Sequence, residues 1–175
     1  MSIRTYLDHT PDIADSAFID ESAVVTGRVS IGEDASVWPL CSVRGDVHDI
    51  RIGARTNIQD NSVLHVTHDG DYAPGGYPLI IGDDVTVGHG VIVHACTVGN
   101  RCLIGMGSIV LDGAIIEDEV MLGAGSLVSP RKTLESGYLY VGSPAKKVRE
   151  LNDKERAFFK YSAEHYVKLA YKHKG

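Results

Sequence analysis

The sequence is short of several residue types, and each shortage narrows the choice of fold and function. Aromatic residues make up only 7% of the 175 residues, which argues against a fold built mainly from packed helices. The three cysteines, Cys41, Cys96 and Cys102, form no CxxC pair, and their odd number argues against a disulfide framework. The formal net charge of −6 gives no electrostatic support for binding nucleic acid.

Long apolar runs are also missing. No window approaches the roughly 20 apolar residues of a membrane-spanning helix, and the N-terminal MSIRTYLDHTPD lacks the apolar segment of a secretion signal. We therefore expect a cytoplasmic protein without a membrane or nucleic-acid partner. Glycine, in contrast, is abundant at 19 residues, which favours short strands and tight turns.

Aliphatic residues recur at every sixth position through most of the chain. One uninterrupted series runs from Ile13 to Val43 and another from Val98 to Val128. Between them the same phase returns in two pieces, at positions 52 to 64 and 81 to 93. The fifth place of each hexad holds a small residue or valine, and the second is often glycine. This hexapeptide pattern predicts a parallel β-helix of about six triangular coils, with glycine easing the corners.

The period changes near the end of the chain, and it is interrupted twice before that, by three extra residues around 43–51 and by eleven between Leu64 and Ile81. Residues 1–151 form the predicted β-helix domain, and about 66–80 are extruded from it as an inserted loop. Residues 152–175 predict a C-terminal helix packed on the outside, because Asn152 and Glu155 form a capping-box pattern. One face of this helix carries Phe158, Tyr161, His165 and Leu169.

Two histidines occupy the same slot on successive coils. His65 and His94 are each the second residue of a hexad, and removal of the eleven inserted residues leaves 29 − 11 = 18 residues between them, one full coil. Stacked imidazoles suit two ligands of one metal ion. His89 lies on a neighbouring face and would reach that ion from another chain, so the register indicates a trimer with interfacial metal sites. The alternative is three ordinary polar residues.

Several motifs resemble the signature of the gamma-class carbonic anhydrases. They are RGD at 44–46, NIQDNSVLH at 57–65 and VGHGVIVHACTVG at 87–99, and the similarity covers nearly the whole chain. Similar bacterial proteins are labelled ferripyochelin-binding or acetyltransferase-like. The resemblance implies an all-β, left-handed β-helix and a homotrimer. Zinc would be held by His65, His94 and His89 of the partner subunit, and a metal-bound hydroxide would convert carbon dioxide to bicarbonate. Three imidazoles would also suit iron or cobalt.

The resemblance further implies roles for residues around the metal. Gln59 would orient the reacting water or bicarbonate. Asn57 and Asp60 would support it by hydrogen bonding, and Tyr166 would reach towards the active site from the terminal helix. These four residues lie in the NIQD motif and in AEHYVKLA.

The same resemblance assigns Arg44 and Asp46 to a pair that bridges subunits, a role that a purely structural ion pair would also meet. The best-known members of the family carry a glutamate where this chain has Val47, and a glutamate-rich loop where this loop has none. We therefore expect low or latent hydration activity. His68, on the loop, is a candidate proton relay or a solvated residue.

Two other functions remain open at this point. The hexapeptide scaffold is shared with acyltransferases, so an acyl-CoA transferase or thioesterase is one alternative. The missing glutamates favour the second, a non-enzymatic metal-binding or scaffolding trimer.

Overall fold

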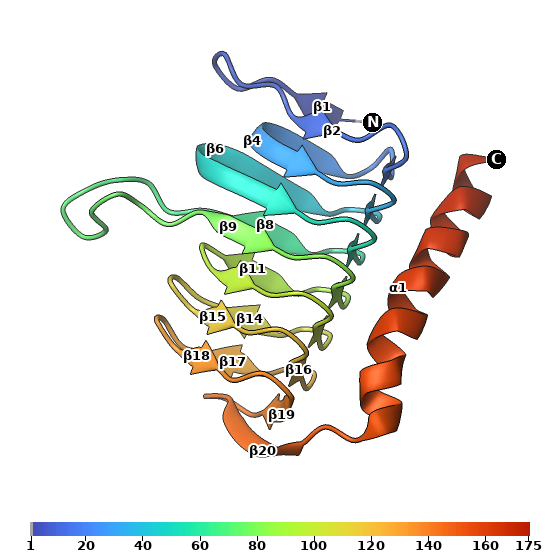
Figure 1. The fold of residues 1–175 in the computed structure, drawn as a ribbon. Helices are drawn as coiled ribbons and strands as arrows, with labels where there is room; N and C mark the ends of the chain where they lie inside the picture. The colour runs from blue at the N-terminus through green and yellow to red at the C-terminus, as the bar shows by residue number, and fades with distance from the viewer. Residues whose placement is uncertain (1) are drawn as a thin grey trace.

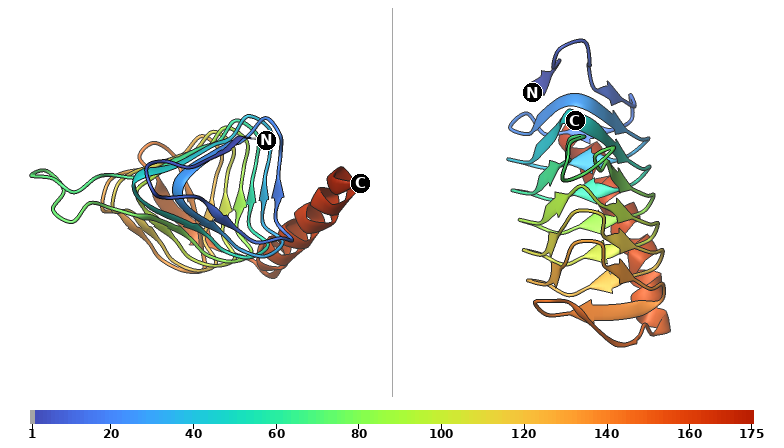
Figure 2. Two further views of the ribbon diagram at one scale, coloured as in Figure 1. Left: turned by 90° about the horizontal axis from the view of Figure 1, so that it is seen from above. Right: turned by 90° about the vertical axis from the view of Figure 1, so that its left-hand side faces the viewer.

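Short strands stack into a triangular prism, and one helix runs along its outside (Figures 1 and 2). The structure is a computed structural model that describes residues 2–175. It confirms the left-handed parallel β-helix with a C-terminal helix on the exterior. The predicted hexads set this shape, because each hexad supplies one short strand and one turn.

The three faces of the prism are named by their strands. Face 1 holds β8 (Val63–His65), β11 (Ile92–His94), β14 (Ile109–Val110) and β17 (Leu127–Val128). Face 2 holds β2 (Asp12–Ile13), β9 (Leu79–Ile81), β12 (Thr97–Val98), β15 (Ile115–Ile116) and β18 (Thr133–Leu134). The long strands β4 (Val24–Ile31) and β6 (Ser42–Ile52) bend across both faces, and β1 (Ser2–Arg4) pairs with β4.

Face 3 carries the helix. Its strands are β3 (Phe18–Ile19), β5 (Ser36–Val37), β7 (Asn57–Ile58), β10 (Thr86–Val87), β13 (Leu103–Ile104), β16 (Met121–Leu122) and β19 (Tyr138–Val141). The antiparallel strand β20 (Lys146–Glu150) ends this face. We call the three edges the loop corner (faces 1 and 2), the His89 corner (faces 3 and 1) and the Arg55 corner (faces 2 and 3).

The first position of each hexad fills the interior. Leu64, Val93 and Val110 on face 1 are fully buried, and the series continues past its predicted end to Leu134 and Tyr140. Each aliphatic side chain buried in this way stabilises the fold by about 1.5–3 kcal/mol. Because a shift of one residue would turn outward-facing side chains into this interior, the register between coils is fixed along the prism.

The corners turn at a different position from the one predicted. The left-handed backbone conformation recurs at the fourth place of a hexad, as in Arg55, Asp84, Arg101 and Glu119. The second-place glycines serve a different purpose, since a Cβ on Gly105 would lie 2.4 Å from the backbone nitrogen of Ala124. Glycine there lets adjacent coils approach closely, so the prediction that it eases the turns was wrong.

The inserted segment leaves the prism at the loop corner, between β8 and β9, and projects away from all three faces (Figure 2). Backbone bridges join Thr67 to Tyr77 and Gly70 to Ala73, so the loop is a narrow hairpin. The base of this hairpin lies directly after His65.

Helix α1 (Asp153–Lys174) begins with the predicted capping box between Asn152 and Glu155. Its packed face differs from the prediction, because Phe158 and Tyr161 are 43% and 62% exposed. The buried residues are Phe159, Ser162, Ala163 and Ala170. Small side chains at three of these four positions let the helix lie close to face 3, which the aromatic periodicity did not reveal.

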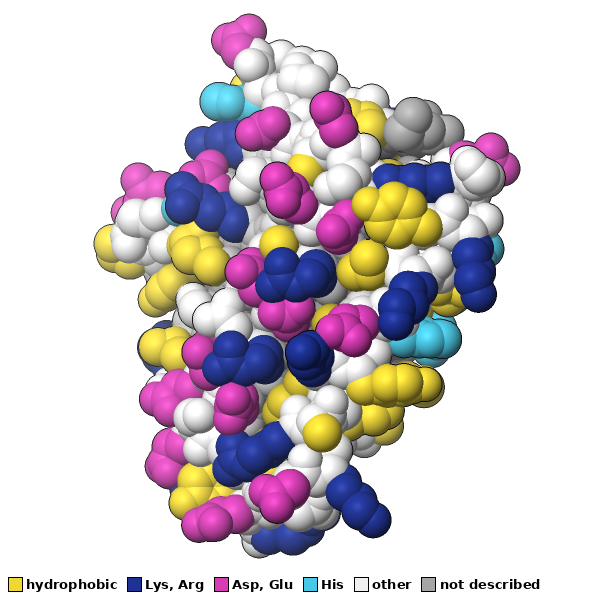
Figure 3. All heavy atoms as spheres, turned by 45° about the vertical axis from the view of Figure 1, so that its right-hand side comes forward, with side chains coloured by type: hydrophobic (Ala, Val, Ile, Leu, Met, Phe, Trp, Pro, Cys, Tyr) yellow, Lys and Arg dark blue, Asp and Glu magenta, His cyan; other side chains and the backbone are white. Residues whose placement is uncertain are grey.

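The side of the molecule seen in Figure 3 carries acidic and basic side chains interspersed with one another. Within residues 2–175, no helix has both the length and the apolar character needed to cross a bilayer.

Candidate metal centre

Four side chains form a ladder along face 1, next to the loop corner. Asp46, His65, His94 and Asp112 come from successive coils, and the two histidines face each other in register on β8 and β11. Asp46 Oδ1 lies 3.0 Å from His65 Nε2, and His65 Nδ1 lies 3.1 Å from His94 Nε2. His94 Nδ1 in turn lies 2.6 Å from Asp112 Oδ1. The register thus places both predicted ligands together, as expected.

The charges of the ladder decide which nitrogens carry hydrogen. Burial would raise the pKa of Asp46, but hydrogen bonds from Arg44 and His65 outweigh it and lower that pKa. The pKa of Asp112 is also lowered, because its hydrogen bonds outweigh burial. Ionised carboxylates only accept, so the outer nitrogens Nε2 of His65 and Nδ1 of His94 must donate. Burial is the main cause that lowers the pKa of His65, which favours its neutral imidazole.

Two lone pairs then face each other across the middle of the ladder. When both imidazoles are neutral, each has its hydrogen on the outer nitrogen, which leaves His65 Nδ1 and His94 Nε2 as bare acceptors 3.1 Å apart. Such a pair is repulsive unless a cation lies between or beside the two atoms. Zinc–nitrogen bonds of about 2.0–2.1 Å at a tetrahedral angle separate two ligand nitrogens by about 3.3 Å. The donor set and its spacing therefore fit a zinc ion.

The third predicted ligand lies at another edge of the prism. His89 sits at the His89 corner, where its Nδ1 lies 2.9 Å from Asp60 Oδ2. Among residues 2–175, no group of three His, Cys, Asp or Glu side chains of one chain is placed to hold a metal ion. A single chain thus presents two facing imidazoles at one corner and one carboxylate-held imidazole at another.

Asn57 and Gln59 are buried beside a groove between face 3 and α1. Gln59 Nε2 donates to Asn57 Oδ1 at 3.1 Å, and Asn57 Nδ2 donates to Thr86 Oγ1 at 3.1 Å. Thr86 Oγ1 and Ser162 Oγ, on α1, are 2.8 Å apart. This chain of contacts fixes both amides, so Gln59 presents its oxygen as an acceptor.

The groove itself has a volume of about 390 Å³ and an apolar lining that includes Met106, Met121 and Phe158. Tyr166 lines the same groove as Gln59 and packs edge-on against Trp38, with ring centroids 5.6 Å apart. Burial raises the pKa of the Tyr166 hydroxyl, which keeps it protonated as a hydrogen-bond donor. The structure thus brings Asn57, Gln59 and Tyr166 together.

Comparisons with known proteins show which family this chain is similar to. Residues 95–130 match the bacterial transferase hexapeptide (six repeats) family. Protein YrdA of Escherichia coli is 60% identical over 166 residues, which cover 95% of this chain and 90% of YrdA. A carbonic anhydrase of Geobacillus kaustophilus is 45% identical over 151 residues, which cover 86% of this chain and 79% of that protein.

The chain belongs to the gamma carbonic anhydrase-like family of hexapeptide-repeat proteins. A solved structure from Bacillus cereus, provisionally assigned as an acetyltransferase, superimposes with a TM-score of 0.90 at 44% identity. The match covers 97% of this chain and 94% of that one. The family is therefore shared by proteins named for two different activities.

The remaining predicted site residues lie in two places, Arg44 at the ladder and Asp60 at the His89 corner. Arg44 Nη1 donates to Asp46 Oδ2 at 2.5 Å within one chain, so this pair supports the ladder directly. Asp60 contacts His89, and its hydrogen-bonding support of Gln59 stays a prediction.

Sequence reasoning missed Asp112 and Thr67. Thr67 Oγ1 donates to Asp112 Oδ2 at 2.5 Å, while the other oxygen of this carboxylate meets His94. Asp112 follows His94 by 18 residues, one full coil, so the same register argument that paired the histidines would have found it.

Proposed function

We propose that this family member is a zinc-dependent carbonic anhydrase that interconverts carbon dioxide and bicarbonate. The observation that carries the proposal is the pair of imidazole nitrogens, His65 Nδ1 and His94 Nε2, that face each other at 3.1 Å. Zinc bound by neutral imidazoles supplies a polarised water as the nucleophile at neutral pH. Asp46 and Asp112 hold the two ring tautomers that leave these nitrogens available.

We further propose that the third ligand is His89 of the partner subunit in a homotrimer. The outward side of face 1 is apolar, with Val63 and Ile92 about two-fifths exposed beside the ladder. Ile109 and Leu127 continue this stripe, half-buried, on the next strands. A threefold ring with face 1 towards its axis buries this stripe and places each loop corner against the next His89 corner.

Residues beside the groove would handle the substrate. Gln59, held by Asn57, would accept a hydrogen bond from the reacting water or from the hydroxyl of bicarbonate. The apolar lining of the groove suits an uncharged, non-polar substrate such as carbon dioxide. Tyr166 would donate a hydrogen bond at the same end of the groove.

Complementation between subunits tests both parts of the proposal. Neither His65→Ala nor His89→Ala should bind zinc or hydrate carbon dioxide alone, although both should form trimers. When the two variants are refolded together in equal amounts, about a quarter of the interfaces should regain all three ligands. Stopped-flow hydration rates, metal content and mass by light scattering are the measurements.

Two results would contradict it. If zinc-loaded wild type hydrates carbon dioxide no faster than His89→Ala, the proposed hydration activity is wrong. If the mixed trimers recover no zinc while the wild type binds it, the proposed sharing of the site between subunits is wrong. Zinc-loaded trimers without turnover on any substrate would instead indicate a scaffolding protein.

The size of the groove favours a second candidate, transfer or hydrolysis of an acyl thioester. A volume of about 390 Å³ is much larger than carbon dioxide requires. The lining offers the hydroxyl groups of Ser162 and Tyr166, but no histidine of the described residues lines it to serve as a general base. Turnover of a CoA-thioester panel that survives His65→Ala would favour this function over hydration.

A further inference from the structure

We propose that Asp112 is a positioning residue that sets the metal affinity of His94, and that Thr67 ties this control to the base of the inserted loop. This inference rests on the proposed zinc site. It concerns two residues that do not touch the metal or the substrate themselves.

Both oxygens of Asp112 are engaged, so its carboxylate cannot turn freely. Oδ1 lies 2.6 Å from His94 Nδ1, and Oδ2 accepts from Thr67 Oγ1 at 2.5 Å. The side chains of Asp112 and His94 are each about one-third exposed, which keeps solvent screening incomplete. An ionised, doubly held acceptor therefore faces one nitrogen of the proposed ligand.

The contact decides which nitrogen of His94 can bind metal. With Nδ1–H donating to Asp112, the lone pair lies on Nε2, which points at His65. Without the carboxylate, the imidazole can take the other tautomer, in which Nε2 carries hydrogen and cannot act as a ligand. The negative charge also makes the imidazole a stronger donor to a cation.

Thr67 connects this arrangement to the hairpin. Its backbone exchanges two hydrogen bonds with Tyr77, at 3.1 and 3.0 Å, which close the base of the loop. Its hydroxyl reaches Asp112 in the coil on the far side of His94. The loop base, Asp112 and His94 are thus linked by consecutive hydrogen bonds, and a shift of the hairpin would move the carboxylate.

The test is zinc affinity, measured by competition with a chromophoric chelator on the intact protein. Asp112→Ala should weaken zinc binding by about 10- to 100-fold, the usual effect of losing a partner of a ligating histidine. Thr67→Val should weaken it less, and Thr67→Ser, which keeps the hydroxyl, should restore wild-type affinity. Cobalt substituted for zinc should show an altered absorption spectrum in Asp112→Ala.

Asp118→Ala is the matched control, because this carboxylate also bonds one coil away, to Asn100, but lies outside the ladder. Asp112→Asn covers the case in which the alanine variant does not fold, and it should also bind zinc more weakly than the wild type. If the wild type binds zinc and all the Asp112 variants that fold bind it as tightly as Asp118→Ala, the inference fails alone. A wild type that binds no zinc overturns both the proposed function and the inference.

Discussion

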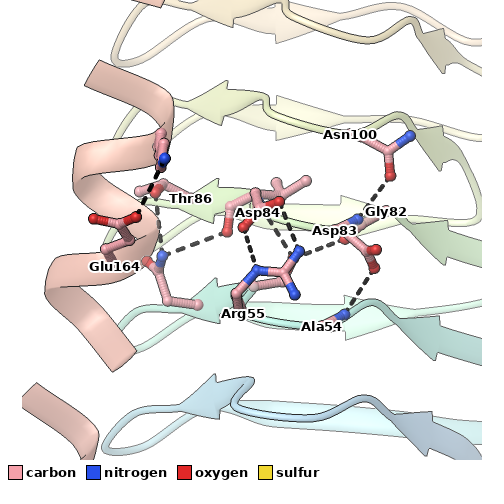
Figure 4. Close-up of polar contacts among 12 residues, drawn as sticks. Ala54, Arg55, Gly82, Asp83, Asp84, Thr86, Asn100 and Glu164 are labelled. Atoms are coloured by element: carbon pink, nitrogen blue, oxygen red, sulfur yellow. Dashed lines mark hydrogen bonds and ion pairs between the residues drawn. The ribbon is translucent and has the colours of Figure 1, made fainter. Parts of the chain in front are cut away.

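Two corners of the prism carry polar ladders spaced by one coil, and they differ in whether the ladder is complete. At the Arg55 corner, Arg55 meets Asp84 through two hydrogen bonds of 2.6 and 2.8 Å (Figure 4). Asp83 likewise accepts from the backbone of Ala54 and its own N–H donates to Asn100. Every one of these contacts matches a donor with an acceptor.

At the loop corner the middle contact of the ladder lacks a donor. Asp46 and Asp112 each accept a hydrogen bond from one histidine, and the remaining nitrogens of the two neutral rings face each other as acceptors. Stacking in register is common to both corners, so it cannot by itself mark a functional site. The two facing acceptors of the neutral rings are what distinguishes the loop corner, and they fit the proposed zinc ion.

The largest expected effect comes from removing one of the facing imidazoles. His94→Ala should reduce zinc content from stoichiometric to trace, because only one of the two facing imidazoles, that of His65, then remains in the ladder. Metal analysis of the purified protein checks this. Asn100→Ala, which removes a member of the ladder at the Arg55 corner, should leave the zinc content unchanged. If both variants lose zinc equally, the proposed difference between the two corners is wrong.

A smaller effect is expected at the Arg55 corner. Arg55→Met should lower the free energy of unfolding by about 0.2–1 kcal/mol, since the side chain is 42% exposed and water screens the ion pair. Urea denaturation with and without zinc measures it. The loss should be the same in both conditions, and a zinc-dependent loss would mean that the two corners are coupled.

The smallest effect concerns the helix, which is tied to the Arg55 corner through Arg156 and Glu119 at 2.7 Å. Hydrogen bonds from Arg149 and from the backbone of Asn152 lower the pKa of Glu155 from 4.5 to about 2. The contribution of the charged cap is therefore fully present above about pH 4.5 and is lost as the pH falls through about 2.

Glu155→Gln should accordingly lower the thermal midpoint slightly at neutral pH. The difference from the wild type should shrink as the pH is lowered from 4.5 towards 2. Circular dichroism melts across this range provide the measurement, and a difference that is constant with pH would contradict the charged cap.

Much of the fold was predictable because the hexad period is strict. Ile13 to Val43 and Val98 to Val128 fix both the coil length and the interior, and the structure confirms the β-helix. The turning positions were mispredicted because a repeated glycine has two physical uses, a left-handed turn or a close approach. Gly105 serves the second, as its distance to the next coil shows.

The site was predictable to the extent that it follows the repeat. His65 and His94 share a slot, so counting residues placed them together. The packed face of α1 does not follow the repeat, and Phe159 and Ala163 were missed in favour of more conspicuous aromatic residues. Asp60 pairs with His89 because corner residues contact the next coil as well as their neighbours along the chain.

The sequence by itself determined the hexad period, the length of a coil and the placement of His65 and His94 side by side, because these depend only on residue spacing along a regular β-helix. The tertiary structure alone decided the direction of each ring nitrogen. Hydrogen bonds to Asp46 and Asp112 turn two lone pairs towards each other, and such bonds depend on side-chain angles between coils that no spacing encodes. Had only one of the two rings taken the opposite tautomer, its N–H would have donated to the other ring and the pair would have been an ordinary polar contact.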